Sequence, residues 1–165
     1  MHSLDQTRLR KIRWALGCFI VGLVFSGVTA FPLQLELDWL AGLRGLDSDG
    51  IPRNAFDRWI LTVRDGLTDT YAKYPWVAYG TDWLAFAHLV VALFFVGPFI
   101  DPVRHISVIY AGLAACALVP VQALVCGPIR QIPLGWRLID CAFGVIGAIP
   151  LLYVLKLSRA TANRV

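Results

Sequence analysis

The chain of 165 residues has few of the side chains on which thiol and metal chemistry depends. It has only four cysteines and three histidines, and no two cysteines form a CxxC pair. This absence weighs against a thiol oxidoreductase of the four-span, quinone-linked kind. His88 has no second histidine and no nearby cysteine at ligand spacing, so we expect no zinc site.

Two further kinds of chemistry are excluded in the same way. A bis-histidine haem needs two imidazoles at one depth in a membrane, whereas His88 and His105 are expected at different depths. The chain has no GxSxG motif, the strained turn that exposes the nucleophilic serine of many hydrolases. We therefore expect neither a metal nor a cofactor.

Charged side chains are also few. They make up 16% of the chain, whereas hydrophobic residues make up 58%. Residues 14–35 and 106–129 contain no charged side chain, and 83–100 contain only His88. Each stretch can cross about 30 Å of hydrocarbon as a helix. We predict an all-α integral membrane protein, a single domain over 1–165, with four transmembrane helices near 12–31, 82–98, 102–126 and 134–155.

The orientation follows from the basic residues that flank the spans. Arg8, Arg10, Lys11 and Arg13 precede the first span, and Lys156, Arg159 and Arg164 follow the last. Both termini are therefore expected in the cytoplasm of a bacterium, with the protein in its inner membrane. The net charge of +4 comes mostly from these flanks, so we expect contact with the lipid bilayer and not with nucleic acid.

An alternative for the N-terminus is a cleavable secretory signal. The basic start and the apolar run ending in Val28-Thr29-Ala30 resemble one, although the run is longer than usual. Cleavage would leave three spans.

The outer loop 32–81 is expected to be helical. Apolar residues recur at helical spacing from Asn54 to Tyr74, with Pro75 as a stop, which predicts an amphipathic helix that lies on the outer leaflet or caps the bundle. Leucines 33, 37, 40 and 43 predict a shorter helix before it, and Asp47-Ser48-Asp49-Gly50 predicts a turn.

Helix ends and packing faces can also be predicted. Asp101 is expected to cap the third span, with Pro102 as its first helical residue. Small residues, which let membrane helices approach closely, mark the expected packing faces: Gly22 and Ser26, then Ala111, Ala115 and Cys116, then Gly144, Gly147 and Ala148. Cys126 and Cys141 are expected at similar depth, as a disulfide or as two packed thiols.

The polar residues of the membrane zone gather in its expected outer half. They are Asp82, His88, Gln122, Arg130, Arg137 and Asp140. The uncharged part of the last span covers only about 22 Å, so Asp140 lies inside the membrane or at its edge, where ionisable groups are costly and mark a site. We expect an outward-facing polar pocket that binds a lipid, a small molecule or a partner, either another membrane protein or a second copy in a homo-oligomer.

Three alternatives stay open. Arg137 and Asp140, three residues apart on one helix, could neutralise each other in a purely architectural role. His88 with Asp82 or Asp140 could act as acid and base in an intramembrane enzyme on a lipid-like substrate. The chain could also be a small transporter or channel subunit, although it shows no internal repeat. In size and span number it resembles lipoprotein signal peptidase, but neither aspartate motif of that family is present.

Overall fold

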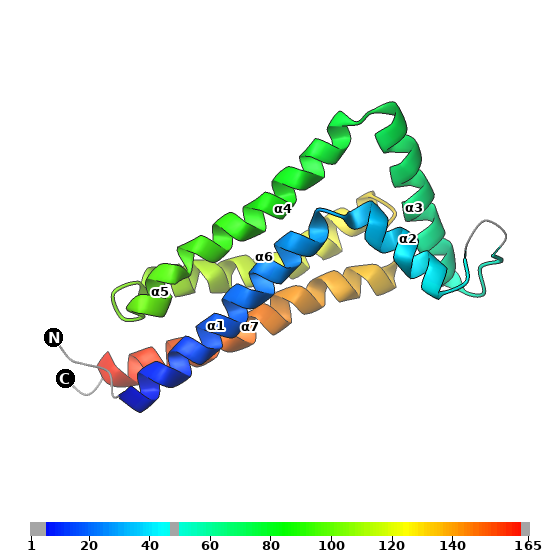
Figure 1. Ribbon diagram of the computed structural model, residues 1–165. Coiled ribbons are helices and arrows are strands. Elements are labelled where there is room, and N and C mark those ends of the chain that lie inside the picture. The colour runs from blue at the N-terminus through cyan, green and yellow to red at the C-terminus, as the bar shows by residue number, and fades with distance from the viewer. Residues whose placement is uncertain (1–5, 47–49, 163–165) are drawn as a thin grey trace. The chain divides into compact units, whose positions relative to one another are not determined.

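The computed structural model describes residues 6–46 and 50–162, and within these ranges all regular structure is α-helical (Figure 1). The helices are α1 (Gln6–Ala30), α2 (Leu33–Leu43), α3 (Ala55–Lys73), α4 (Trp76–Phe94), α5 (Val96–Ile100), α6 (Ile106–Ile129) and α7 (Leu134–Ala162). The all-α prediction is confirmed. Asp47, Ser48 and Asp49 of the predicted turn, and Arg164 of the basic flank, lie outside the described residues.

Four helical stretches are long and apolar enough to cross a membrane. They are Gln6–Ala30, Trp76–Ile100, Ile106–Ile129 and Leu134–Arg159. Each is 24 to 26 residues long, or about 36–39 Å, which exceeds the thickness of the hydrocarbon core. The chain is therefore a multi-pass membrane protein. The second span begins at Trp76 instead of the predicted 82, because the helix resumes directly after Pro75.

The third span begins later than predicted, at Ile106 instead of 102. The Oδ1 atom of Asp101 accepts hydrogen bonds from the backbone N–H groups of Val103, at 3.2 Å, and Arg104, at 3.0 Å. These bonds close a separate turn before the helix starts. Asp101 therefore caps this turn and not α6, which corrects the predicted boundary.

Contacts along the chain divide it into two compact units. The first comprises Met1–Gly22 with Val91–Val165, and the second comprises Leu23–Val90. Helices α1 and α4 each contribute residues to both units. The assignment of residues 1–165 to a single domain stays a prediction.

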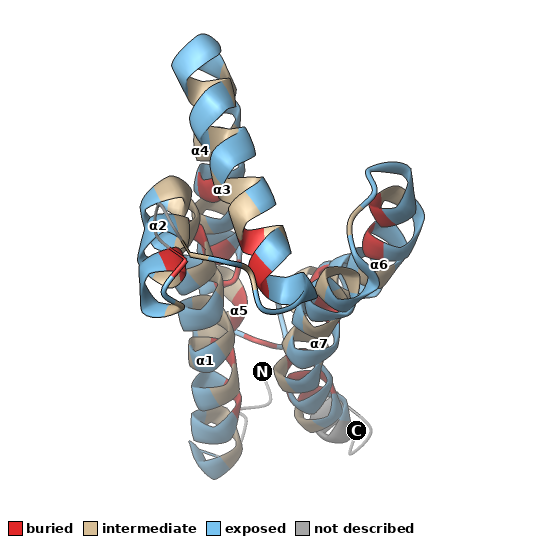
Figure 2. Cartoon of the chain, turned by 90° about the vertical axis from the view of Figure 1, so that its right-hand side faces the viewer, coloured by how far each residue is buried: buried red, intermediate tan, exposed pale blue. Residues whose placement is uncertain are grey.

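In the first unit, the completely buried apolar side chains of the long helices belong to the first half of α1, the start of α6 and the end of α7. They are Ile12, Leu16, Ile109, Leu151 and Val154. The ring of Phe19 packs edge-on against Phe95 with centroids 4.7 Å apart, and Gly112 is so close to Phe95 that a Cβ would be 2.6 Å from the ring. Most other positions on the long helices are exposed or half-buried (Figure 2), as expected for helices that face lipid.

In the hairpin of α6 and α7, two glycines of α7 pack against the turn of α6 that ends at Pro120. Pro120 has no N–H group, so it cannot bond the carbonyl of Cys116 one turn earlier. Gly144 of α7 lies directly against this carbonyl oxygen, and Gly147 lies beside the Cys116 sulfur. Gly144 therefore shields this carbonyl from lipid, where a backbone group without a hydrogen bond is costly.

The prediction of small packing residues is confirmed only in part. Gly144, Gly147 and Cys116 do meet at a helix contact. Gly22 is exposed, and a Cβ there would have no neighbour within 4 Å. Ala111 and Ala115 are also exposed, and Gly112 between them is the buried residue. Which small residue packs depends on the rotation of each helix, which composition does not reveal.

In the second unit, α2 and α3 form a hairpin around a small apolar core. Its buried residues are Ala41, Leu46 and Ile60, with Leu40 and Leu61 packed against them. The side chain of Asn54 accepts a hydrogen bond of 2.9 Å from the Asp57 N–H group and so caps α3. The predicted amphipathic helix and the shorter helix before it are both confirmed. Their place on the outer leaflet stays a prediction.

An ion pair between the end of α2 and a buried carboxylate of α3 was not predicted. Asp57 is only 1% exposed, and its Oδ1 atom lies 2.6 Å from Nη2 of Arg44. Its Oδ2 atom accepts a hydrogen bond of 3.0 Å from the Arg53 N–H group. Burial raises the pKa of Asp57, but the hydrogen bonds and positive charges of Arg44 and Arg53 outweigh it, so the pKa lies below its ordinary value.

Candidate functional site

The six residues predicted to line a polar pocket belong to both units. Asp82 and His88 lie on α4 in the second unit, whereas the other four lie in the first. Of these, Gln122 is on α6, Arg130 follows its last residue, and Arg137 and Asp140 are on α7. The assembly of all six residues into one pocket therefore stays a prediction.

On α4, the imidazole of His88 is held by its own helix. Its Nδ1 atom lies 2.9 Å from the carbonyl oxygen of Leu84, one turn earlier, and because a carbonyl oxygen only accepts, Nδ1–H is the donor. The side chain is exposed and Asp82 is half-buried. The two residues are separated by roughly 9 Å along the helix axis, so they do not form a direct acid–base pair.

The turn between α6 and α7 closes tightly and sets the geometry of the remaining residues. The N–H group of Ile132 donates to the Gly127 carbonyl at 2.9 Å, and that of Gln131 donates to the Pro128 carbonyl at 3.0 Å. This is a Schellman motif, in which the left-handed residue is usually glycine. Here it is Gln131, with a φ of 58°. The motif brings the first turn of α7 beside the last turn of α6.

Arg137 lies across the end of α6. Its Cγ and Cδ atoms occupy the space that a Cβ at position 127 would need, so Gly127 is required for this contact. The Nε atom of Arg137 is buried and has no hydrogen-bond partner among the described residues. Within the same residues no ion pair links Arg137 to Asp140, which is exposed. The structure thus does not have the mutual neutralisation considered from sequence.

The remaining polar groups near this turn are only partly engaged. Gln122 accepts a hydrogen bond from the Cys126 thiol, with the Sγ and Oε1 atoms 3.5 Å apart. Arg130 is exposed at the end of α6. All four cysteines are free, so Cys126 and Cys141 are not joined by a disulfide. The turn therefore offers two guanidinium groups, of which Arg137 is the one held in place by packing.

The arrangement of Arg137 favours an anion. A guanidinium is charged at any physiological pH and presents its N–H donors in a planar fork that fits a carboxylate or a phosphate. A charge in the membrane zone without a counter-charge is costly, and an anionic ligand removes that cost. We name Arg137, Gly127 and Arg130 the turn site.

Sequence reasoning found both arginines of the turn site but missed Gly127. The available signal was a glycine one residue before a proline at the end of an apolar stretch, which by itself indicates only a helix end. The contact with Arg137 depends on the length and conformation of the connecting turn. Only the folded hairpin reveals it.

Neither a metal-ligand cluster nor similarity to known proteins points to a different functional site. Among the described residues, no group of three or more histidine, cysteine, aspartate or glutamate side chains is placed to hold a metal ion. Comparison of the chain with protein families, curated proteins and solved structures finds no match.

Proposed function

We propose that the chain is a non-enzymatic component of the bacterial inner membrane, with both termini in the cytoplasm, that binds an anionic group through the turn site. The observation that carries this proposal is the buried Nε atom of Arg137, which has neither a hydrogen-bond partner nor a carboxylate beside it among the described residues. The orientation rests on the basic residues at the start of α1 and the end of α7.

Three features support binding instead of a purely architectural role. The stem of Arg137 is held against Gly127, so the guanidinium is positioned before a ligand arrives. Arg130 adds a second positive charge at the same turn. The exposed carboxylate of Asp140 does not pair with Arg137 in the structure, which leaves the guanidinium available for a lipid, a small molecule or a partner protein with an acidic group.

Replacement of Arg137 by glutamine is expected to release the anionic ligand. A hydrogen bond to a charged group contributes about 1.5–3 kcal/mol, so the affinity for the anionic ligand should fall at least about tenfold. The measurement is native mass spectrometry of protein extracted from bacterial membranes in mild detergent. We expect a defined adduct, which is a lipid, a small molecule or a second polypeptide, on the original protein.

The controls separate the site from general effects of charge. Arg137→Lys keeps the charge without the planar fork and should retain part of the adduct. Arg58→Gln removes an exposed arginine of α3 and should retain all of it. An unmodified protein with no adduct, or an Arg137→Gln variant with the same adduct as the original, would overturn the proposal.

A further inference from the structure

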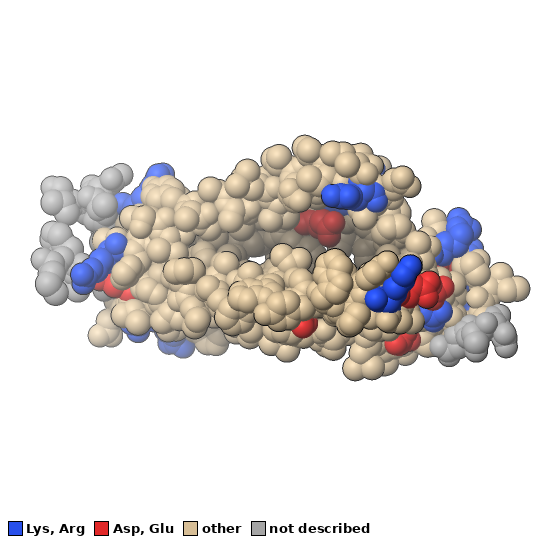
Figure 3. Space-filling model, turned by 90° about the horizontal axis from the view of Figure 1, so that it is seen from above, with Lys and Arg blue, Asp and Glu red and all other residues tan. Residues whose placement is uncertain are grey.

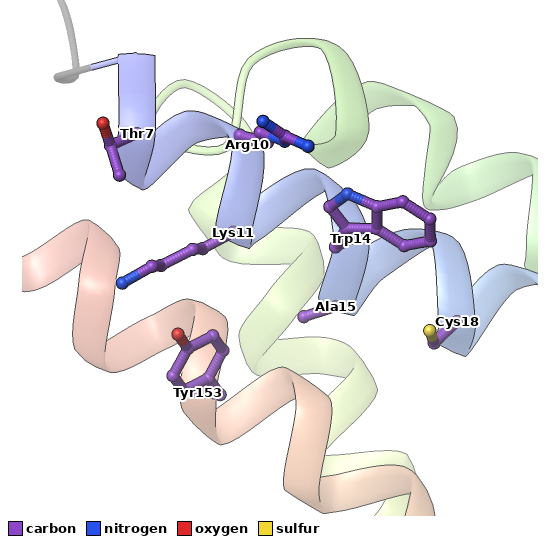
Figure 4. Close-up of a pocket in the computed structure, with 7 residues that line it drawn as sticks. All are labelled: Thr7, Arg10, Lys11, Trp14, Ala15, Cys18 and Tyr153. Carbon is purple, nitrogen blue, oxygen red and sulfur yellow. The ribbon is translucent and has the colours of Figure 1, made fainter.

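A groove lies in the first unit between α1 and α7, far from the turn site. Its volume is about 480 Å³, and its lining includes Lys11, Trp14, Ala15 and Cys18 of α1 and Tyr153 of α7 (Figure 4). Tyr153 follows Arg137 by about 24 Å along α7, so the two sites are well separated along that helix. The side chains of Lys11 and Tyr153 extend into the space between the two helices.

The groove lies near the start of α1 and in the second half of α7. Basic side chains gather at the end of the molecule where α1 begins and α7 ends (Figure 3). The basic side chains here are Arg8, Arg10, Lys11, Arg13, Arg104, Lys156 and Arg159. The acid nearest to them in sequence among the described residues is Asp101, whose Oδ1 atom already accepts two backbone hydrogen bonds. The charge at this end therefore favours an anionic occupant.

Two of these arginines donate hydrogen bonds that link helices, which distinguishes them from Lys11. Arg13 donates to the carbonyl oxygen of Phe99 at 3.3 Å and links α1 to α5. Arg159 donates to the hydroxyl of Tyr110 at 3.0 Å and links α7 to α6. Lys11 and Arg10 both line the groove, and neither forms an ion pair within the described residues. Lys11 is the one whose side chain extends toward Tyr153, whereas Arg10 points away from α7 (Figure 4).

The position of the groove matches the boundary between lipid headgroups and acyl chains. The charge-free part of α1 begins at Trp14, directly after Arg13, and the charge-free part of α7 ends just before Lys156. Trp14 is 68% exposed and Tyr153 is 43% exposed, and such aromatic side chains concentrate at this boundary. Ala15 and Cys18 continue the groove as an apolar floor toward the membrane interior.

We propose that this groove binds an anionic phospholipid, with its phosphate on the Lys11 ammonium group and an acyl chain along Trp14, Ala15 and Cys18. A basic pocket between membrane helices is a recognised form of site for anionic headgroups. The apolar floor favours a lipid over a soluble anion, since only a lipid supplies a chain to cover it. The proposal does not depend on the turn site.

The test uses purified full-length protein in detergent, titrated with phosphatidylglycerol and, separately, with phosphatidylcholine, and followed by native mass spectrometry. We expect phosphatidylglycerol to bind more tightly than phosphatidylcholine. Lys11→Gln should weaken phosphatidylglycerol binding about fivefold and phosphatidylcholine binding less, because the choline cation offsets the charge of the phosphate that Lys11 contacts. Ala15→Phe should fill the groove and weaken the binding of both lipids.

A matched control is available at the same end of the molecule. Lys156→Gln removes the same charge from an exposed position that does not line the groove, and its effect should be smaller than twofold. Arg137→Gln should also leave phosphatidylglycerol binding unchanged, which separates this site from the turn site. Equal losses in Lys11→Gln and Lys156→Gln would indicate diffuse attraction and overturn the proposal. So would equal affinity of the original protein for the two lipids.

Discussion

Replacement of Gly144 by alanine is expected to force α6 and α7 apart. A Cβ at this position would overlap the carbonyl oxygen of Cys116 and would lie 2.9 Å from Cδ of Pro120 and 3.1 Å from Cβ of Val119. Overpacking of this kind costs about 1–3 kcal/mol, and the cost should be at the upper end here because a backbone oxygen cannot move aside as a side chain can. The separation would also expose the Cys116 carbonyl, which has no helical donor.

The measurement is the free energy of unfolding in detergent micelles, from titration with a denaturing detergent. Gly135→Ala is the matched control, because Gly135 lies on the same helix and a Cβ there would have no neighbour within 4 Å. Its stability should be unchanged or raised by up to about 1 kcal/mol, the helix propensity gain of alanine over glycine. Equal unfolding free energies for the two variants would contradict the packing described for Gly144.

The hairpin of α2 and α3 is expected to lose stability in acid through Asp57. Its carboxylate is ionised in the fold, and its pKa lies below the ordinary value of about 3.9 because Arg44 and the Arg53 N–H group outweigh the effect of burial. The stabilisation is therefore complete above the unfolded-state pKa and is lost as the pH falls through the lower folded-state pKa. Below that pH the protonated carboxyl no longer attracts Arg44.

Hydrogen exchange of the α2 and α3 amides, corrected for the intrinsic effect of pH, measures this dependence. Asp57→Asn should abolish it, whereas Asp65→Asn should preserve it, because the Asp65 carboxylate paired with Arg64 is exposed. Arg44→Met should increase exchange strongly at neutral pH, where the buried carboxylate loses its counter-charge, and less in acid. The prediction fails if Asp57→Asn keeps the pH dependence of the original protein.

Features that depend on local spacing were predictable without the fold. Lipid requires about twenty apolar residues in succession for each crossing, so the charge-free stretches identify the spans directly. The helix from Ala55 to Lys73 is encoded by the spacing of its apolar residues, by the cap at Asn54 and by the stop at Pro75. The two arginines of the turn site were predictable because charge at the edge of a span is rare.

The sequence by itself therefore determined an all-helical chain with four stretches able to cross a membrane, because lipid and helix periodicity act on neighbouring residues. The tertiary structure decided which residues meet. Arg44 reaches Asp57 from the end of α2, Gly144 covers the carbonyl that Pro120 cannot bond, and the stem of Arg137 lies on Gly127. Each contact joins two successive helices or their ends, and its geometry depends on helix rotation and turn conformation, which no local pattern encodes.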